Sequence, residues 1–124
     1  MTASSVAGSF AQAVIARDFA GARELLHPGI DFRAMTPRRI WEADDPAGIE
    51  EILRGWLADP DEEIARIEPA EPGALVADTA RVGWVVHGTG EDGPFVFEQQ
   101  AYIREDDGRV AWLRIMCSGP RPAQ

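Results

Sequence analysis

Apolar residues recur at helical spacing in the first half of the chain and alternate with polar residues in the second half. Helical spacing predicts a helix with one buried face, and alternation predicts a half-buried strand. The third helical stretch has the clearest ends, because Asp45 is a good N-cap, Pro46 suits the first turn, and Pro60 follows the last apolar position. Helices are expected over residues 3–17, 19–26 and 46–57.

The alternating pattern predicts one short strand and four longer ones. The short strand is expected over residues 30–37, and residues 38–43 are expected to pair back with it or to continue the edge. The four longer strands are expected over residues 62–68, 74–88, 94–105 and 109–119. Short turns rich in Gly, Pro and Asp separate these four, which predicts a meander. The whole order indicates an α+β fold with helices packed on one side of an antiparallel sheet.

The composition is that of a single soluble domain. A length of 124 residues suffices for one core, so we expect one domain over residues 1–124. No apolar run approaches the roughly 18 residues of a membrane span, and the first 16 residues lack the basic start and apolar block of a secretion signal. Cys117 is the only cysteine, which excludes an internal disulfide and fits a reducing compartment. We therefore expect a cytoplasmic protein.

The charge pattern excludes several classes of partner. A net charge of -9 repels phosphate backbones, and the chain has no basic stripe to offset that repulsion, so nucleic acid is not expected to bind. Most acidic residues, those within residues 59–63 among them, fall in expected turns and exposed faces, where they favour solubility. His27 and His87 lie far apart in sequence without neighbouring cysteines, so we expect no metal, and we expect no cofactor and no membrane partner.

Two stretches carry a resemblance to a known family. They are "ARDFAGARELLHPGIDF" near the front, and at the back the strand with Tyr102, an acidic turn and a strand that begins "GRV". With this order of elements, residues 6–119 resemble the nuclear transport factor two-like superfamily, which includes SnoaL-like polyketide cyclases, limonene-epoxide hydrolases and ketosteroid isomerases. The resemblance implies a cone-shaped curved antiparallel sheet around three N-terminal helices, with a cavity between its concave face and the helices.

The resemblance also suggests which side chains enter that cavity. The Arg-X-Asp pattern of limonene-epoxide hydrolases lies over Arg81-Val82-Gly83, which would turn Arg81 inward, and side chains alternate along a strand from such an anchor. Arg81 is then the expected polar anchor of a largely apolar cavity. The lining is expected to comprise Phe10, Phe32, Trp56, Arg81, Val85, His87, Phe97, Gln99, Leu113 and Ile115.

The catalytic groups of the best-defined relatives have no counterparts at the matching positions. Epoxide hydrolysis of this kind needs two carboxylates bridged by an arginine, and Gly83 and Ile115 stand where those carboxylates would be. Ketosteroid isomerisation needs a tyrosine and a carboxylate base, and Phe10 and Ala34 stand there instead. The remaining candidates for catalysis are His87 and Arg81, while Cys117 is expected to be structural because burial opposes thiolate formation.

Three functions remain open at this point. The leading hypothesis is a protein whose apolar cavity binds a small hydrophobic molecule with its polar group near Arg81. The second is a SnoaL-like enzyme, namely a polyketide cyclase, isomerase or epoxide hydrolase-like protein, with His87 as acid or base and Arg81 as oxyanion group. The third is a dimeric interaction module whose cavity is filled by its own side chains.

The expected outer face of the sheet is rich in aromatic residues. A large exposed aromatic surface usually marks an interface, so we expect a homodimer through the sheet. The residues expected at this interface are Trp84, Tyr102, Trp112 and Met116. Arg38, Arg39 and Trp41 form a separate basic and aromatic cluster, which is expected to cover the cavity mouth, to bind an acidic partner, or to be a solvated edge that discourages strand pairing.

Overall fold

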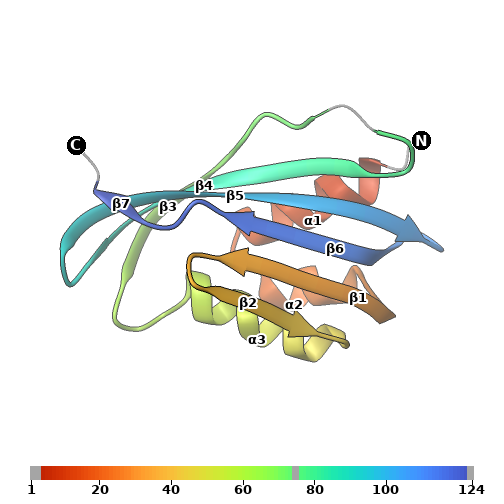
Figure 1. Cartoon of the computed structure of the whole chain (residues 1–124), viewed down its shortest axis with the longest axis horizontal. Helices are drawn as coiled ribbons and strands as arrows, with labels where there is room; N and C mark the ends of the chain where they lie inside the picture. Colours follow the sequence, from red (N-terminus) through yellow and green to blue (C-terminus); the bar gives the residue numbers. More distant parts are fainter. Residues whose placement is uncertain (1–3, 74–75, 123–124) are drawn as a thin grey trace.

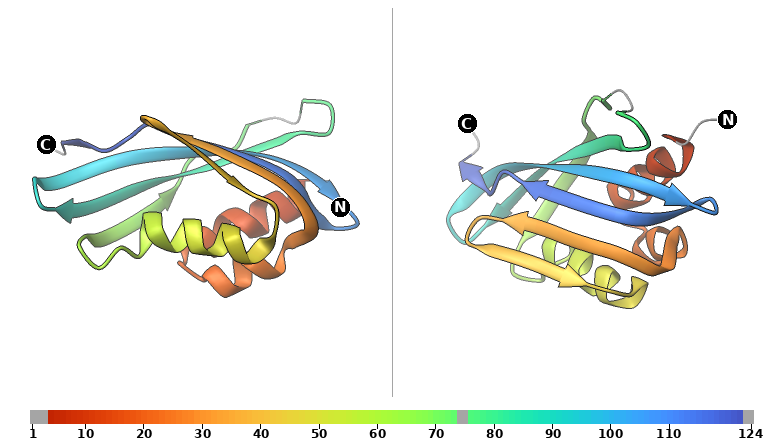
Figure 2. Two further views of the ribbon diagram at one scale, coloured as in Figure 1. Left: turned by 60° about the horizontal axis from the view of Figure 1, so that its bottom comes forward. Right: turned by 45° about the vertical axis from the view of Figure 1, so that its right-hand side comes forward.

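The computed structural model describes residues 4–73 and 76–122, and it shows three helices on one side of a curved seven-stranded sheet (Figures 1 and 2). The helices are α1 (Ser4–Ile15), α2 (Phe19–Glu24) and α3 (Pro46–Leu57). The strands are β1 (Leu26–Thr36), β2 (Arg39–Ala43), β3 (Glu63–Pro69), β4 (Ala80–Gly90), β5 (Gly93–Asp106), β6 (Arg109–Cys117) and β7 (Arg121–Pro122). The expected α+β architecture is confirmed.

The sheet is mixed, whereas the sequence predicted an antiparallel one. Its order is β2-β1-β6-β5-β4-β3, with β7 paired to β5. The meander from β3 to β6 is antiparallel as expected, but β1 runs parallel to β6. Short turns force consecutive strands to reverse direction, whereas β1 and β6 lie far apart in the chain, so no hairpin turn fixes their relative direction.

The largest differences from the predicted element boundaries lie at the starts of β1 and β4. The second helix ends at Glu24, and Leu26 already pairs with Val110, so the residues after Leu26 open β1 instead of closing the helix. The strand expected over residues 74–88 begins at Ala80. Residues 74 and 75 lie outside the described residues, as does residue 3 of the first expected helix, and Val76 only forms an isolated bridge with Thr79.

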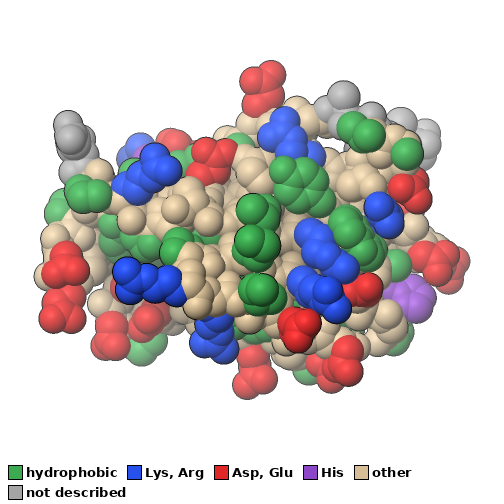
Figure 3. Space-filling model, in the orientation of Figure 1, with side chains coloured by type: hydrophobic (Ala, Val, Ile, Leu, Met, Phe, Trp, Pro, Cys, Tyr) green, Lys and Arg blue, Asp and Glu red, His purple; other side chains and the backbone are tan. Residues whose placement is uncertain are grey.

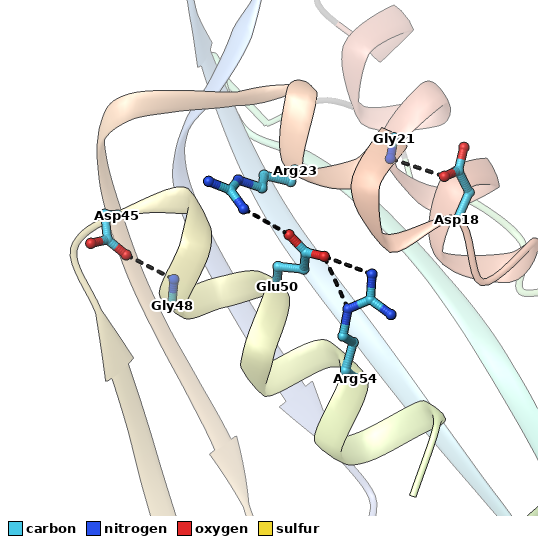
Figure 4. A network of polar contacts seen from close by, with 7 residues as sticks. All are labelled: Asp18, Gly21, Arg23, Asp45, Gly48, Glu50 and Arg54. Atoms are coloured by element: carbon cyan, nitrogen blue, oxygen red, sulfur yellow. Dashed lines mark hydrogen bonds and ion pairs between the residues drawn. The ribbon is translucent and has the colours of Figure 1, made fainter.

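The third helix has the ends that its sequence predicts. The side chain of Asp45 accepts a hydrogen bond from the Gly48 N–H at 2.8 Å, and Pro46 occupies the first turn (Figure 4). Capping of this kind satisfies one of the N–H groups that a helix start leaves without a partner. The first residue of α3, and therefore the place of Trp56 along the helix, is thus set by local sequence.

An arginine from α2 and a glutamate from α3 join the two helices (Figure 4). Glu50 accepts hydrogen bonds from Arg54 at 2.7 Å and from Arg23 at 3.1 Å. The hydrogen bonds from Arg54 and then Arg23 hold the pKa of Glu50 below its ordinary value. This ion-pair cluster links α3 to α2 on the surface of the helical layer.

The core lies between the helices and the inner face of the sheet. Trp84 is the largest fully buried side chain, and its ring centroid lies 6.3 Å from that of Phe10 on α1. Directly opposite residues of antiparallel strands share a face, and Trp84 stands opposite Gln99, and Val86 opposite Phe97. The inner face of β4 is therefore the one that carries Trp84 and Val86.

Candidate functional site

A hollow of about 400 Å³ lies beside the C-terminal end of α3, between the β1–β2 hairpin and the inner face of β5 and β6. Its volume falls within the range of about 300–1,000 Å³ that is usual for small-molecule sites. The hairpin, the end of α3, the sheet and the segment after β6 all contribute side chains. The lining residues are Thr36, Pro37, Trp41, Gly55, Trp56, Asp59, Glu62, Phe97, Gln99, Cys117 and Pro120.

Gln99 is the only buried polar side chain among the described residues, with 1% of its surface exposed. It lies on the inner face of β5 between Phe97 and Ala101, and it lines the hollow. The indole Nε1–H of Trp84 donates a hydrogen bond to Gln99 Oε1 at 2.7 Å. Because an indole N–H can only donate, this bond fixes which end of the amide faces Trp84. The other end, Nε2, has no hydrogen-bond partner among residues 4–73 and 76–122.

Aromatic side chains form the walls of the hollow. The rings of Trp41 and Trp56 meet edge to face, with centroids 5.7 Å apart and planes at 90°. Trp41 Nε1–H donates to Thr36 Oγ1 at 2.8 Å, and the guanidinium of Arg39 stacks 3.4 Å from the centroid of the Trp41 ring. Trp56 Nε1 is buried without a hydrogen-bond partner in the described part of the chain. The hairpin is thus held in place over α3.

Two carboxylates line the hollow where the chain leaves α3. Glu62 is partly buried, and it makes no ion pair or side-chain hydrogen bond with any described residue. Burial raises the pKa of Glu62, and the nearby charges of Asp59 and Asp61 raise it further. Asp59 Oδ1 accepts a hydrogen bond from the Asp61 N–H at 2.8 Å, which shapes the loop. The hollow therefore carries negative charge next to its aromatic walls.

Cys117 stands opposite Gln99 on β6 and shares its face of the sheet. Its thiol is partly exposed and lines the hollow, and the Gly119 N–H lies 3.5 Å from Sγ. Gly119 has a φ of +81°, and a Cβ at this position would lie 2.6 Å from Pro37 Cγ. Only glycine fits there, so the segment after β6 closes tightly against the hairpin.

The orientation predicted for Arg81, Val85 and His87 is wrong, because all three lie on the outer face of the sheet. Arg81 stands opposite Tyr102, and His87 stands opposite Val96. The buried pairs of β4 and β5 lie between these positions, for example Trp84 with Gln99, so they face the other side of the sheet. Placing Arg81 inward would have exposed Trp84 and buried a cation, which is a costly exchange. The hydrophobic alternation of β4 was the better guide than the Arg-X-Asp match.

On the outer face, Arg81 has protein partners of its own. Its Nη1 donates to Gln100 Oε1 at 3.0 Å, and Gln100 in turn donates to Glu98. The loop at Gly73 covers the guanidinium so closely that a Cβ there would lie 2.5 Å from Arg81 Nε. Arg81 is therefore bound within the outer surface and cannot anchor a molecule in the hollow.

His87 also lies outside the hollow. Its Nε2 is 3.1 Å from Glu68 Oε2, and Arg66 Nε donates to the other oxygen of Glu68 at 2.9 Å. These two contacts, that of His87 first, hold the pKa of Glu68 below its ordinary value. The histidine and its carboxylate are both partly exposed on β3 and β4, on the side of the sheet that faces away from the helices.

The other predicted lining residues divide into two groups. Trp56, Phe97 and Gln99 meet at the hollow as expected. Phe10, Phe32, Leu113 and Ile115 are buried in the core and do not line it.

Sequence reasoning did not assign Thr36, Asp59 or Glu62 to the lining, whereas it did place Cys117, as a structural residue, on the cavity face of the last strand. Asp59 and Glu62 were interpreted as solubility residues, because a loop after a helix reaches a cavity only through the tertiary fold. One available signal was the position of both carboxylates within six residues of Trp56 on the apolar stripe of α3.

The outer face carries part of the predicted aromatic surface (Figure 3). Tyr102 and Trp112 are half-buried and Met116 is exposed, whereas Trp84 is fully buried, so its assignment to this surface is wrong. The guanidinium groups of Arg104 and Arg114 lie 4.2 Å and 4.4 Å from the Trp112 ring centroid. In Figure 3 hydrophobic and arginine side chains accordingly lie side by side over the centre of the sheet.

The described residues contain neither a cluster of metal-ligating side chains nor a membrane-spanning helix. No group of three or more His, Cys, Asp or Glu side chains in this part of the chain could hold a metal ion. Within the same residues, no helix has both the length and the apolar character needed to cross a membrane.

Comparison with known proteins identifies the fold. No family model and no curated protein sequence matches the chain. Among solved structures, IdmH of Streptomyces antibioticus, a candidate polyketide cyclase, superposes with a TM-score of 0.71 at 17% identity over 95% of this chain and 93% of its own. The chain has the nuclear transport factor two-like fold.

Two further structures with this fold broaden the comparison. An epoxide hydrolase of M. tuberculosis, similar to limonene-epoxide hydrolase, superposes with a TM-score of 0.65 at 14% identity over 94% of this chain and 82% of its own. The second is a hypothetical Catenulispora acidiphila protein with a ketosteroid isomerase-like fold, in complex with trimethylamine. It superposes with a TM-score of 0.69 at 11% identity over 93% of this chain and 85% of its own. At these identities the comparison establishes the fold, and function has to be argued from the side chains of the hollow.

Proposed function

We propose that this protein binds a small hydrophobic molecule in the hollow and that Gln99 anchors a hydrogen-bond acceptor of that molecule, such as a ketone oxygen. The observation that carries the proposal is the buried amide of Gln99, whose oxygen is held by Trp84 while its nitrogen has no partner in the described structure. The aromatic walls formed by Trp41, Trp56 and Phe97 suit an apolar or aromatic body.

The energetic argument rests on the unused N–H groups of Gln99. Gln99 Nε2 is not among the buried polar atoms that are cut off from solvent without a partner, so its N–H groups open into the hollow. A hydrogen bond from Nε2 to a ligand acceptor would contribute about 0.5–1.5 kcal/mol net. The Gln99 amide therefore favours a ligand that places an acceptor next to it over an entirely apolar ligand.

Gln100 provides a matched control for a test of this proposal. It has the same side chain one residue away, but it lies on the outer face next to Arg81. Isothermal titration calorimetry with 2-acetylnaphthalene would compare the wild type, Gln99→Leu and Gln100→Leu. We expect Gln99→Leu to weaken binding about fivefold to tenfold, as for the loss of one buried hydrogen bond, and Gln100→Leu to leave it unchanged. Absence of binding to the wild type, or equal effects of both variants, would contradict the proposal.

Arg81 and His87 are not placed to act on a molecule in the hollow, because both side chains lie on the outer face of the sheet. The similar structures include a candidate cyclase and an epoxide hydrolase, but they are similar to this chain in fold alone.

We also propose that a second copy of the chain covers the outer face of the sheet. Met35 and Met116 stand side by side in register with 49% and 46% of their surfaces exposed, next to half-buried Tyr102 and Trp112. Sedimentation equilibrium is expected to give twice the mass of 13.5 kDa, and Met116→Asp is expected to shift it toward one copy. A wild type that sediments as a single copy at all concentrations would refute the dimer.

A cytoplasmic location is part of the same proposal, supported by the single cysteine, which suits a reducing compartment. Cell fractionation of the native host would test it, and recovery in a secreted fraction would contradict it.

A further inference from the structure

We infer that the ligand of the hollow is an amine, with a protonated nitrogen at its outer end held by Asp59 and Glu62 and an acceptor at its inner end held by Gln99. This inference rests on the proposed function and adds the charge class of the ligand to it. Its basis is the distribution of charge and hydrogen-bonding groups around the hollow.

The charge that lines the hollow has one sign. Among the residues that the structure describes, Asp59 and Glu62 are the only charged residues in its lining, and no arginine lines it. Arg39 stacks on the Trp41 ring but does not line the hollow. An anionic ligand such as a carboxylate or a phosphate would meet two carboxylates and no cation, whereas an ammonium group would be attracted by both.

Glu62 is the more informative of the two carboxylates. It is partly buried, and no described residue gives it an ion pair or a side-chain hydrogen bond. The elements around it add mostly negative charge, since it also borders a depression formed by the β4–β5 turn and the segment after β6. The charged residues around Glu62 are Asp59, Asp61, Glu91, Asp92 and Arg121.

Burial and the neighbouring Asp59 and Asp61 both disfavour the ionised form of Glu62, and its pKa is raised accordingly. A cation bound next to it would offset these two effects, because an opposite charge within a few ångströms stabilises a carboxylate. The free protein therefore holds an anion without a counterion at the edge of an aromatic hollow, which is the arrangement that an amine complements.

The aromatic walls and the inner end define the rest of the ligand. Trp41 already stacks with one guanidinium, that of Arg39, and tryptophan faces attract cations. Gln99 is 1% exposed, and its Nε2 makes no hydrogen bond with a described residue, so the N–H groups at the inner end favour an acceptor over a second cation. The ligand thus has an acceptor at one end, an aromatic or apolar body, and an ammonium group at the other end.

Three aryl ketones would separate this inference from the function on which it rests. They share the body of 2-acetylnaphthalene and carry an aminomethyl, a hydroxymethyl or a carboxylate group at position 6, so that only the charge of the outer end differs. Calorimetry at neutral pH and low salt is expected to give the order amine, alcohol, carboxylate from tightest to weakest. The amine is expected to bind about threefold to tenfold more tightly than the alcohol.

Variants then assign the preference to the two carboxylates. Glu62→Gln and Asp59→Asn are each expected to reduce the preference for the amine over the alcohol, while the affinity for the alcohol stays the same. Glu63→Gln is the matched control, because Glu63 is the exposed neighbour that does not line the hollow. It is expected to leave the preference intact although it removes the same charge.

Each outcome has a definite meaning. Equal binding of the three ketones, with Gln99→Leu still weakening all of them, overturns the amine inference and leaves the proposed function standing. Absence of binding by all three overturns both. A preference for the amine that Glu63→Gln reduces as much as Glu62→Gln overturns the inference too, since it would arise from the net charge of the protein.

Discussion

Gln99 and Gln100 are consecutive residues of β5 with the same side chain, yet they belong to two different regions of the molecule. Gln99 is buried on the inner face and accepts a hydrogen bond from Trp84, whereas Gln100 lies on the outer face and accepts one from Arg81. Alternation along a strand separates them, so one faces a hollow and the other a solvated surface. The hydrogen bond between Trp84 and Gln99 therefore belongs to the core and to the candidate site. The hydrogen bond between Arg81 and Gln100 belongs to the surface.

The largest expected difference between the two regions lies in stability. Trp84→Ala removes the largest fully buried side chain, its packing on Phe10 and the hydrogen bond to Gln99. We expect it to lower the free energy of unfolding by about 3–5 kcal/mol, and Arg81→Ala to lower it by about 1 kcal/mol or less. Urea unfolding of both variants measures this, and a larger loss for Arg81→Ala would reverse the assignment of faces.

A smaller difference is expected between the two glutamines. Gln99→Leu leaves the indole N–H of Trp84 buried without an acceptor, at a cost of about 1–3 kcal/mol. Gln100→Leu leaves a partly exposed arginine that can turn to water, so its effect is expected to be below about 1 kcal/mol. Thermal unfolding of the two variants at one pH provides the comparison, and equal losses would show that the two faces do not differ in this way.

The smallest expected effects concern two glutamates whose pKa values are displaced in opposite directions. The pKa of Glu62 is raised above 4.5 by burial and then by Asp59 and Asp61, while that of Glu68 is lowered below 4.5, mainly by its hydrogen bond with His87. As pH rises from 4.5 through the higher pKa of Glu62, the folded protein should lose stability relative to Glu62→Gln. As pH falls from 4.5 through the lower pKa of Glu68, the wild type should lose the stability that it has over Glu68→Gln at higher pH.

Melting temperatures of the wild type and these two variants, followed from acidic to neutral pH, test the two signs together. Each variant is compared with the wild type at the same pH, so that the titration of the remaining carboxyl groups cancels. A difference that moves in the same direction for both variants would mean that the two glutamates share one kind of environment.

Periodicity predicted most of the fold, including the three helices, the four-stranded meander, and the inward faces of β5 and β6. The cavity itself was expected from the family resemblance, and of the eleven residues that line the hollow the predicted lining contained Trp56, Phe97 and Gln99. The parallel pairing of β1 with β6 did not follow, because strands distant in the chain have no turn that fixes their direction.

The facing of β4 was predictable but was predicted wrongly. Ala80, Val82, Trp84 and Val86 form the more apolar set, and burying that set leaves the arginine and the histidine outside. The prediction followed the Arg-X-Asp match at Arg81 instead of this pattern, and it therefore assigned the side chains of β4 to the wrong faces of the sheet. Asp59 and Glu62 were beyond the reach of periodicity, since they lie in a loop whose proximity to Gln99 depends on the tertiary fold.

The central claim is that the amide of Gln99 contacts the bound molecule, and the side-chain amide signals of Gln99 and Gln100 in a ¹H–¹⁵N correlation spectrum test it most directly. Titration with 6-aminomethyl-2-acetylnaphthalene is expected to shift the Gln99 signals until they saturate at the dissociation constant found by calorimetry, while the Gln100 signals stay in place. Unmoved Gln99 signals at a concentration where calorimetry shows the ligand bound would contradict the account.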